Sequence, residues 1–274
     1  MPELPEVETV KESLKLKLIG KKINGINILW DNIIAYPGKE EFANEIINKN
    51  IIDIKRRGKF LMFDLEEYYL LSHLRMEGKY FFKNNDEAIN KHEHVIFDLG
   101  NNEELRYMDT RKFGKMYLIN KNDIDNIGPL RELGLEPWDD NLTGNYLINK
   151  YKNKKLPIKT VLLDQSIIVG IGNIYADEIL FLSRINPLKI SNLISKDECK
   201  NIIKYTREVL EKAIRKGGTT IRTYSSVDGV HGLFQNELLV HGKDKGNCPA
   251  CNEKVDKIRV GGRGTYYCPK CQKM

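Results

Sequence analysis

Four cysteines near the C-terminus have the spacing of a metal site. They form two pairs, Cys248-x2-Cys251 and Cys268-x2-Cys271, with sixteen residues between the pairs. Two cysteines at this spacing share a tight turn, and two such turns complete a tetrahedral zinc site. Because protein supplies all four ligands, no position remains for a reacting water, so the pattern predicts one structural Zn2+ in a ribbon or hairpin. The fifth cysteine, Cys199, lies on an apolar helical face and is expected in the core.

The basic residues of this 274-residue chain are unevenly distributed. There are 44 lysines and arginines against 38 acidic residues, a formal net charge of +6. Residues 141–160 carry five lysines and no acid, and residues 241–274 carry eight bases and three acids. Positive charge concentrated on two segments indicates a polyanionic partner such as nucleic acid. A solvated lysine-rich surface is the alternative interpretation.

The composition excludes two broad classes of protein. With 41% hydrophobic and 30% charged residues, the chain is neither a disordered tail nor a membrane bundle. No apolar run approaches the ~20 residues that a membrane-spanning helix needs. The first ten residues hold three glutamates and no basic segment, so we expect no signal peptide and a cytoplasmic location. The length is sufficient for two folded units.

The elements that must position these residues change in character along the chain. A first helix is expected from Pro2, with Glu3 and Glu6 in its first turn and an apolar face that includes Val7, Val10 and Leu14. Six short strands are then predicted, which favours a sandwich or barrel; they lie at residues 26–30, 60–65, 68–74, 94–99, 104–109 and 114–119. Residues 121–140 form the expected boundary.

The second half of the chain is predicted to be helical. Two short helices are expected at 142–151 and 158–164, and a third at 173–185 with Asn173 as its N-cap. The longest begins at the capping box Ser195-x-x-Glu198 and ends at the Gly217-Gly218 pair.

Five motifs now coincide in order along the chain. They are the start Met1-Pro-Glu-Leu-Pro-Glu-Val-Glu-Thr, Arg-Arg-Gly-Lys ending at Lys59, Gly-Ile-Gly-Asn ending at Asn173, Gly-Arg-Gly-Thr-Tyr-Tyr-Cys around Arg263, and the zinc spacing. Together they resemble bacterial formamidopyrimidine-DNA glycosylases, base-excision repair enzymes of the helix-two-turn-helix class. The resemblance runs end to end. It implies an α+β multidomain fold, with a catalytic helix and β-sandwich over 1–125, a helix-two-turn-helix DNA-binding domain over 136–220 and a zinc-finger hairpin over 235–274.

The resemblance assigns the nucleophile to Pro2. Removal of Met1 would expose a secondary amine, and an α-amino group titrates near ~8, so a useful fraction is neutral at pH 7. Attack on the anomeric carbon of the sugar would expel the base and leave an iminium. Glu3 lies beside this nucleophile, where its carboxyl could protonate the departing base or the opened sugar oxygen. The structural alternatives are a helix-starting proline and a glutamate that serves the helix dipole.

Three further residues take phosphate-related roles by the same resemblance. Lys59 is expected to contact the DNA backbone and assist base release, and a surface lysine is its alternative. Arg263, between glycines of the zinc hairpin, is expected to bind phosphate at the lesion and assist strand cleavage. Asn173, at a helix N-terminus, would add a phosphate contact.

Excision also requires that the lesion be extruded from the duplex and the gap filled. The family's gap-filling residues correspond to Met76, Arg111 and Phe113, although core packing is an alternative for Met76 and Phe113. Arg111 is expected to bond the orphaned cytosine, and His92 and Lys155 are expected to contact the DNA backbone.

Recognition of the base is the least defined part. A loop over 217–226, with Thr219 and Thr220, matches the position of the family's lesion-capping loop. Glu6 and Glu77 are candidate pocket residues, with solvated surface as an equal alternative. Arg75 and Glu77 stand where other family members carry smaller residues, which puts the details of the pocket in doubt.

The expected activity is that of a bifunctional DNA glycosylase and abasic-site lyase acting on 8-oxoguanine and formamidopyrimidines in duplex DNA. Pro2 would form the Schiff base, and β- and δ-elimination would follow. One alternative is an endonuclease VIII-type enzyme for oxidised pyrimidines, and another is a non-catalytic zinc protein that binds damaged DNA. The chain is expected to act as a monomer at the bacterial nucleoid, without a membrane partner.

Overall fold

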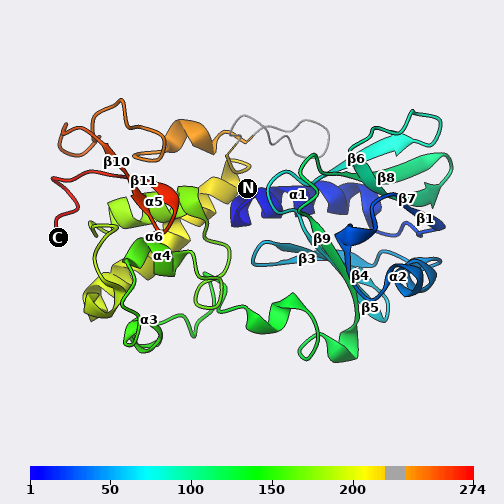
Figure 1. Ribbon diagram of the computed structural model, residues 1–274, viewed down its shortest axis with the longest axis horizontal. Helices are drawn as coiled ribbons and strands as arrows, with labels where there is room; N and C mark the ends of the chain where they lie inside the picture. Colours follow the sequence, from blue (N-terminus) through cyan, green and yellow to red (C-terminus); the bar gives the residue numbers. More distant parts are fainter. Residues whose placement is uncertain (220–231) are drawn as a thin grey trace. The chain divides into compact units, whose positions relative to one another are not determined.

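The computed structural model describes residues 1–219 and 232–274. The chain divides into a first unit of Met1–Arg131 with Gly217–Gly232 and a second unit of Glu132–Lys216 with Leu233–Met274. Figure 1 shows the elements of both units. Among the described residues, no helix combines the length and the apolar character needed to span a membrane.

The first unit is built mainly of β-strands. Its longer helices are α1 (Leu4–Leu18) and α2 (Lys39–Ile46). Its strands are β1 (Gly25–Ile28), β2 (Ile34–Tyr36), β3 (Asp53–Arg57), β4 (Phe60–Leu65), β5 (Tyr68–His73), β6 (Lys79–Asn84), β7 (Glu93–Gly100), β8 (Glu103–Met108) and β9 (Lys115–Asn120). Short 3-10 helices lie at Asp31–Ile33, Lys121–Asp123 and Pro129–Glu132.

The strands of this unit form two sheets. One has four strands in the order β1-β7-β8-β6, and the other has five in the order β2-β9-β5-β4-β3. All neighbouring strands are antiparallel except β2 and β9. A single apolar core takes side chains from both sheets and from α1, so the predicted sandwich is confirmed.

Helix α1 shows the expected spacing of buried side chains. Val7, Val10, Leu14 and Leu18 recur at helical intervals and all belong to the core of the sandwich. The helix begins at Leu4, however, rather than at Pro2, because Glu3 is its N-cap residue with extended backbone angles. The sequence-based start was therefore two residues too early.

The strand predictions are correct in part. β4, β5, β7, β8 and β9 lie where strands were predicted. The first predicted strand, over 26–30, ends early, because Trp30 caps a 3-10 helix instead of continuing β1. Strands β2, β3 and β6 and helix α2 were not predicted.

The second unit is mainly helical. Its helices are α3 (Gly144–Tyr151), α4 (Ile158–Leu162), α5 (Asn173–Leu182) and α6 (Lys196–Arg215), with 3-10 helices at Ser191–Leu193 and Phe234–Glu237. The strands β10 (Asp256–Val260) and β11 (Arg263–Tyr267) form an antiparallel hairpin. Helix α5 packs against both α6 and β11 (Figure 1). The α+β class, with a helical domain and a C-terminal hairpin, is the predicted one.

The ends of α6 follow from its sequence. The Ser195 hydroxyl accepts a hydrogen bond from the Glu198 backbone N–H at 3.2 Å, and the Glu198 carboxylate accepts from the Ser195 N–H at 2.8 Å. This is the predicted capping box. At the other end, Gly217 and Gly218 adopt positive φ, which terminates the helix. Cys199 is fully buried on this helix, as expected.

Candidate functional site

The start of the chain is held inside the first unit by one carboxylate. Pro2 and Glu3 are buried, and the Glu6 Oε2 atom accepts a hydrogen bond from the Glu3 N–H at 2.9 Å. The Glu6 Oε1 atom accepts from both the backbone N–H of Thr219, at 2.7 Å, and its hydroxyl, at 3.0 Å. Glu6 therefore bonds the beginning of α1 to the described end of the 217–219 segment. The predicted pocket residue Thr220 lies outside the described residues.

Burial of the first amine favours its neutral form. Burial is the largest effect on the Met1 amine, and it lowers the pKa below its ordinary value. The Lys59 ammonium also lowers this pKa. Three carboxylates raise it, those of Glu3, Glu6 and Glu77. These four predicted site residues thus lie within electrostatic range of the chain start. A neutral amine is the nucleophilic form.

Lys59 occupies a tight turn rather than a strand. It is the second residue of the two-residue turn between β3 and β4, after Gly58, whose φ is +57°. Only 6% of Lys59 is exposed, which excludes the interpretation as a surface lysine. A lysine buried beside the start of the chain has the position expected of a residue that acts on a bound group.

His73 joins this group, although the sequence did not assign it a role. It lies at the end of β5, and its ring contacts Phe60 edge-on at 4.6 Å between centroids. Burial, then the charges of Arg75 and Lys59, lower the pKa of His73 to about 3. Its Nδ1 atom accepts from the Arg75 N–H at 3.0 Å, so the neutral ring carries its proton on Nε2. The available signal was its place at the head of the segment His73-Leu-Arg-Met-Glu-Gly.

Met76, Arg111 and Phe113 lie on turns rather than in the core. Met76 follows β5 and is half-buried, whereas Arg111 and Phe113 are exposed, Phe113 by 48%. The Arg111 guanidinium stacks over the Phe113 ring at 4.8 Å. The buried Asp109 carboxylate accepts backbone N–H bonds from Arg111 and Phe113 at 3.0 Å each, and from Gly114 at 2.8 Å. The core-packing alternative for Met76 and Phe113 is therefore wrong.

Tyr107 brings these two turns together. Its hydroxyl lies where a Cβ atom on either Gly78 or Gly114 would collide with it, at 2.1 and 1.8 Å. Glycine at both positions lets the two turns approach the same buried side chain. The Thr110 hydroxyl also donates a hydrogen bond to the Glu77 carboxylate, across the two turns. The turn that carries Met76 and the turn that carries Arg111 and Phe113 are therefore neighbours.

His92 lies directly before β7 and is half-buried. Its backbone N–H donates to the Asn90 Oδ1 atom at 2.9 Å, and its carbonyl accepts from the Asp109 N–H at 2.9 Å. Asp109 thus holds both the His92 backbone and the turn of Arg111 and Phe113.

In the second unit, Asn173 is hydrogen-bonded to the residue that follows Arg263. Asn173 is the first residue of α5, and its side-chain amide donates to the Gly264 carbonyl in β11 at 3.0 Å. Arg263, the neighbour of Gly264, is exposed at the start of β11. The N-cap of α5 is Gly172, so the predicted N-cap role of Asn173 is wrong: its amide is bonded to the hairpin.

The predicted basic segment over 141–160 is only partly available to a polyanion. Lys155 is exposed between α3 and α4. Lys159, in contrast, is fully buried, bonds the Asn173 carbonyl at 2.9 Å and pairs with the buried Asp177. Lys159 therefore supports the first turn of α5 from within. This role was not predictable from the sequence, because nothing in the local pattern distinguishes Lys159 from the other four lysines of the segment.

The four cysteines form one cluster at the end of the second unit. Their sulfurs all lie within 4.8 Å of one another, with Cys248 to Cys271 at 3.8 Å and Cys251 to Cys268 at 3.5 Å. Zn–S bonds of about 2.3 Å in a tetrahedron place sulfurs about 3.8 Å apart, which fits this spacing. The cluster is thus a site for one structural Zn2+, closed to any reacting ligand.

Three family models match the chain in succession. Residues 1–116 match the formamidopyrimidine-DNA glycosylase N-terminal domain, and residues 133–225 match the formamidopyrimidine-DNA glycosylase H2TH domain. Residues 247–273 match the zinc finger found in FPG and IleRS.

Similar proteins cover the chain from end to end. A formamidopyrimidine-DNA glycosylase of Oceanobacillus iheyensis is 47% identical, over 99% of this chain and 98% of the relative. A Lactococcus lactis FPG mutant, solved in complex with Fapy-dG-containing DNA, superposes with a TM-score of 0.93 at 38% identity, and all of both chains is covered. Wild-type Lactococcus lactis FPG, solved with DNA containing an oxidised pyrimidine, gives a TM-score of 0.91 at 37% identity, over 100% of each chain.

Proposed function

The chain belongs to the formamidopyrimidine-DNA glycosylase family, whose members are DNA glycosylases with abasic-site lyase activity, and from that premise we propose that it excises oxidised purines through a Schiff base on Pro2. The proposed substrates are 8-oxoguanine and formamidopyrimidines in duplex DNA. β-Elimination and then δ-elimination break the sugar–phosphate bonds on the two sides of the abasic site.

The environment of the chain start carries this proposal. Burial and the Lys59 charge both favour a neutral first amine, and Glu3 lies directly beside it in the sequence. After removal of Met1, the Pro2 nitrogen is a secondary amine in the same setting. It bonds to the anomeric carbon as the bond between that carbon and the base breaks. The nitrogen then gives up its proton, and the bond between the anomeric carbon and the ring oxygen breaks as that oxygen is protonated, which leaves an iminium that activates the sugar for elimination.

Glu3 supplies the proton in this scheme. It is 2% exposed, so its carboxyl is screened little by water. A positioned acid contributes about 10²–10⁴-fold to a step in which a leaving group must be protonated. The departing base or the opened sugar oxygen takes this proton. Lys59 contacts the backbone of the same nucleotide and assists base release.

The second unit supplies the phosphate contacts. Asn173 stands at the N-terminus of α5, where the helix dipole favours an anion. Its side chain bonds Gly264, next to Arg263, so these two residues form one anion-binding group. Arg263 binds the phosphate at the lesion and assists strand cleavage. Lys155 of this unit and His92 of the first contact the DNA backbone elsewhere.

Met76, Arg111 and Phe113 fill the gap left by the extruded base. Exposed apolar and cationic groups on neighbouring turns suit insertion into a base stack, which costs a few kcal/mol of unstacking. Arg111 also bonds the orphaned cytosine. Asp109 fixes the turn before DNA arrives, which lowers the entropy lost on binding.

The base pocket includes Glu6, Glu77, Thr219 and Thr220 in this proposal. Glu6 already bonds the Thr219 backbone and hydroxyl, so its support for the pocket acts through the position of the 217–219 segment. The 217–226 loop reads the lesion with backbone amides.

An oxidised pyrimidine is the second candidate substrate, because a solved relative binds DNA that contains one. Incision of two matched duplexes separates the candidates, one with 8-oxoguanine opposite cytosine and one with thymine glycol. We expect a higher kcat/KM on 8-oxoguanine. A strong preference for thymine glycol would reassign the enzyme to the endonuclease VIII type.

The proposed organisation assigns catalysis to residues 1–125, helix-two-turn-helix DNA binding to 136–220 and the zinc-finger hairpin to 235–274.

The enzyme acts as a monomer on cytoplasmic DNA at the bacterial nucleoid. Size-exclusion chromatography with light scattering checks the monomer, for which a mass near that of one chain is expected.

A further inference from the structure

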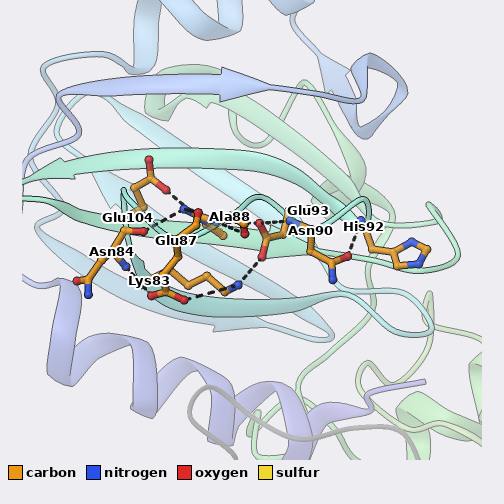
Figure 2. Close-up of polar contacts among 9 residues, drawn as sticks. Lys83, Asn84, Glu87, Ala88, Asn90, His92, Glu93 and Glu104 are labelled. Atoms are coloured by element: carbon orange, nitrogen blue, oxygen red, sulfur yellow. Dashed lines mark hydrogen bonds and ion pairs between the residues drawn. The ribbon is translucent and has the colours of Figure 1, made fainter.

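A buried guanidinium organises one end of the four-stranded sheet. Arg106, in the central strand β8, is 1% exposed. Each of its five N–H groups has an acceptor within the unit (Figure 2). The acceptors are the Glu104 and Glu93 carboxylates and the carbonyls of Asn84, Glu87 and Ala88. Arg106 is thus a scaffold for the segment after β6, with no donor left for DNA.

Glu93 connects Arg106 to the segment that contains Asn90. Its Oε2 atom accepts from Arg106 at 3.1 Å and from the Asn90 backbone N–H at 3.0 Å, and its Oε1 atom pairs with Lys83 at 3.0 Å. Burial opposes ionisation of Glu93, but the bonds from Lys83, Asn90 and Arg106 outweigh it and hold its pKa below the ordinary value. Two cations therefore neutralise a carboxylate that fixes the Asn90 backbone.

Asn90 completes the connection to His92. Its Oδ1 atom accepts from the His92 N–H at 2.9 Å, and its carbonyl accepts from the Glu93 N–H at 2.9 Å. The His92 carbonyl is held separately by the Asp109 N–H. Both backbone groups of His92 are fixed, and its imidazole points away from the network (Figure 2).

We propose that Asn90 and Glu93 are positioning residues that hold His92 in the orientation in which it contacts the DNA backbone. The proposal rests on the DNA-contact role of His92 in the proposed function. An exposed polar loop that had to become ordered on binding would lose conformational entropy, which weakens association. The relay from Arg106 through Glu93 and Asn90 orders this segment in advance.

A double-mutant cycle between Asn90 and His92 tests the relay. We measure Kd for an undamaged duplex and for an 8-oxoguanine duplex with Asn90→Ala, His92→Ala and the double variant. Asn90→Ala should raise both Kd values by about three- to ten-fold, the range expected for one hydrogen bond. The two duplexes should be affected equally, because a backbone contact is independent of the lesion. The double variant should bind no more weakly than His92→Ala alone.

Two further variants separate positioning from general damage to the fold. Asn90→Ser should restore most of the affinity, because a serine hydroxyl can accept from the N–H two residues ahead. Asn120→Ala is the matched control, since Asn120 Oδ1 makes the same kind of bond to the Asn122 N–H, at 3.0 Å, after β9. It should bind DNA as the wild type does.

Wild-type affinity in Asn90→Ala, or additive losses in the double variant, would overturn the proposal. Wild-type affinity in His92→Ala would also overturn the proposal, because it would show that His92 does not contribute to binding the DNA backbone. Excision of 8-oxoguanine, measured on the same samples, tests the proposed function separately, because the affinities for undamaged duplex stand whether or not excision occurs.

Discussion

Thr110 donates a hydrogen bond from its hydroxyl to the Glu77 carboxylate, and so bonds together the two turns that carry the proposed gap-filling side chains. Tyr107 lies against both turns from the core side. From the sequence alone, Glu77 was predicted to be either a pocket residue or a solvated surface glutamate. From its contact with Thr110, we infer that Glu77 aligns the turn of Met76 with the turn of Arg111 and Phe113.

Replacing Thr110 by valine tests this alignment, since valine keeps the shape and removes the hydroxyl. We expect kcat/KM on an 8-oxoguanine duplex to fall by about three-fold or more, the effect of one hydrogen bond. The Kd for undamaged duplex should be unchanged, because that complex needs no inserted side chain. Thr110→Ser, which keeps the hydroxyl, should behave as the wild type. Equal activity in the valine and serine variants would contradict a role for this bond.

The buried neutral His73 predicts a dependence of stability on pH. Its pKa is about 3 in the folded protein, against about 6.5 for an unperturbed histidine. The unfolded chain therefore binds one more proton between these values, so the free energy of unfolding falls as the pH falls through this window. The contribution of neutral His73 to the free energy of unfolding is fully present above about pH 6.5. Between pH 6.5 and pH 5 it should diminish by about 1.6 kcal/mol.

Urea unfolding at several pH values checks this prediction, with His73→Gln as the comparison. Glutamine cannot titrate, so the free energy of unfolding of the variant should vary less between pH 6.5 and 5 than that of the wild type. Parallel curves for the two proteins would contradict this prediction, because they would show that His73 takes up its proton at the same pH in the folded and unfolded states.

The third prediction concerns the zinc cysteines and the hairpin that they hold. The hairpin packs with α5 through a small apolar cluster of Phe181, Val240, Val255 and two of the cysteines, Cys248 and Cys268. Such a cluster cannot stabilise the hairpin without metal. Cys268→Ser should therefore lose zinc, displace Arg263 and raise the Kd for DNA by about ten-fold or more, as expected when phosphate contacts are lost.

Zinc content by metal analysis and Kd by fluorescence anisotropy are measured on the same sample. Cys199→Ser is the control, because Cys199 is buried on α6 away from the cluster and should leave the zinc content intact. Full DNA affinity in a zinc-free Cys268→Ser protein would contradict the role given to the hairpin.

Local sequence signals predicted the elements whose ends are set by their own residues. The Ser195 capping box and the Gly217-Gly218 pair bound α6 as expected, because both act within a few residues of the chain. The zinc cluster was equally predictable, since its ligand spacing is itself the chemical requirement. The segments missed lack such signals. In β3, Asp53–Arg57, only Ile54 is fully buried, so charged residues conceal the strand.

The site was predicted less completely, because its support comes from residues distant in sequence. Asn173 has the side chain of an N-cap, yet its amide bonds Gly264, 91 residues later. Lys159 was predicted as part of a basic surface segment, yet it is buried against Asp177. His73 owes its low pKa to burial and to Arg75 and Lys59 around it. The partners Gly264, Asp177 and Lys59 leave no pattern in the local sequence of the residues they support.

Borohydride trapping tests the central claim most directly. The probe is a duplex with 8-oxoguanine opposite cytosine, and reduction converts the proposed iminium into a stable covalent adduct. We expect the wild-type protein to form an adduct that maps to the N-terminal peptide at Pro2. Pro2→Gly should bind the duplex with unchanged Kd and lose both the adduct and excision. An adduct at another residue, or undiminished trapping by Pro2→Gly, would contradict the account.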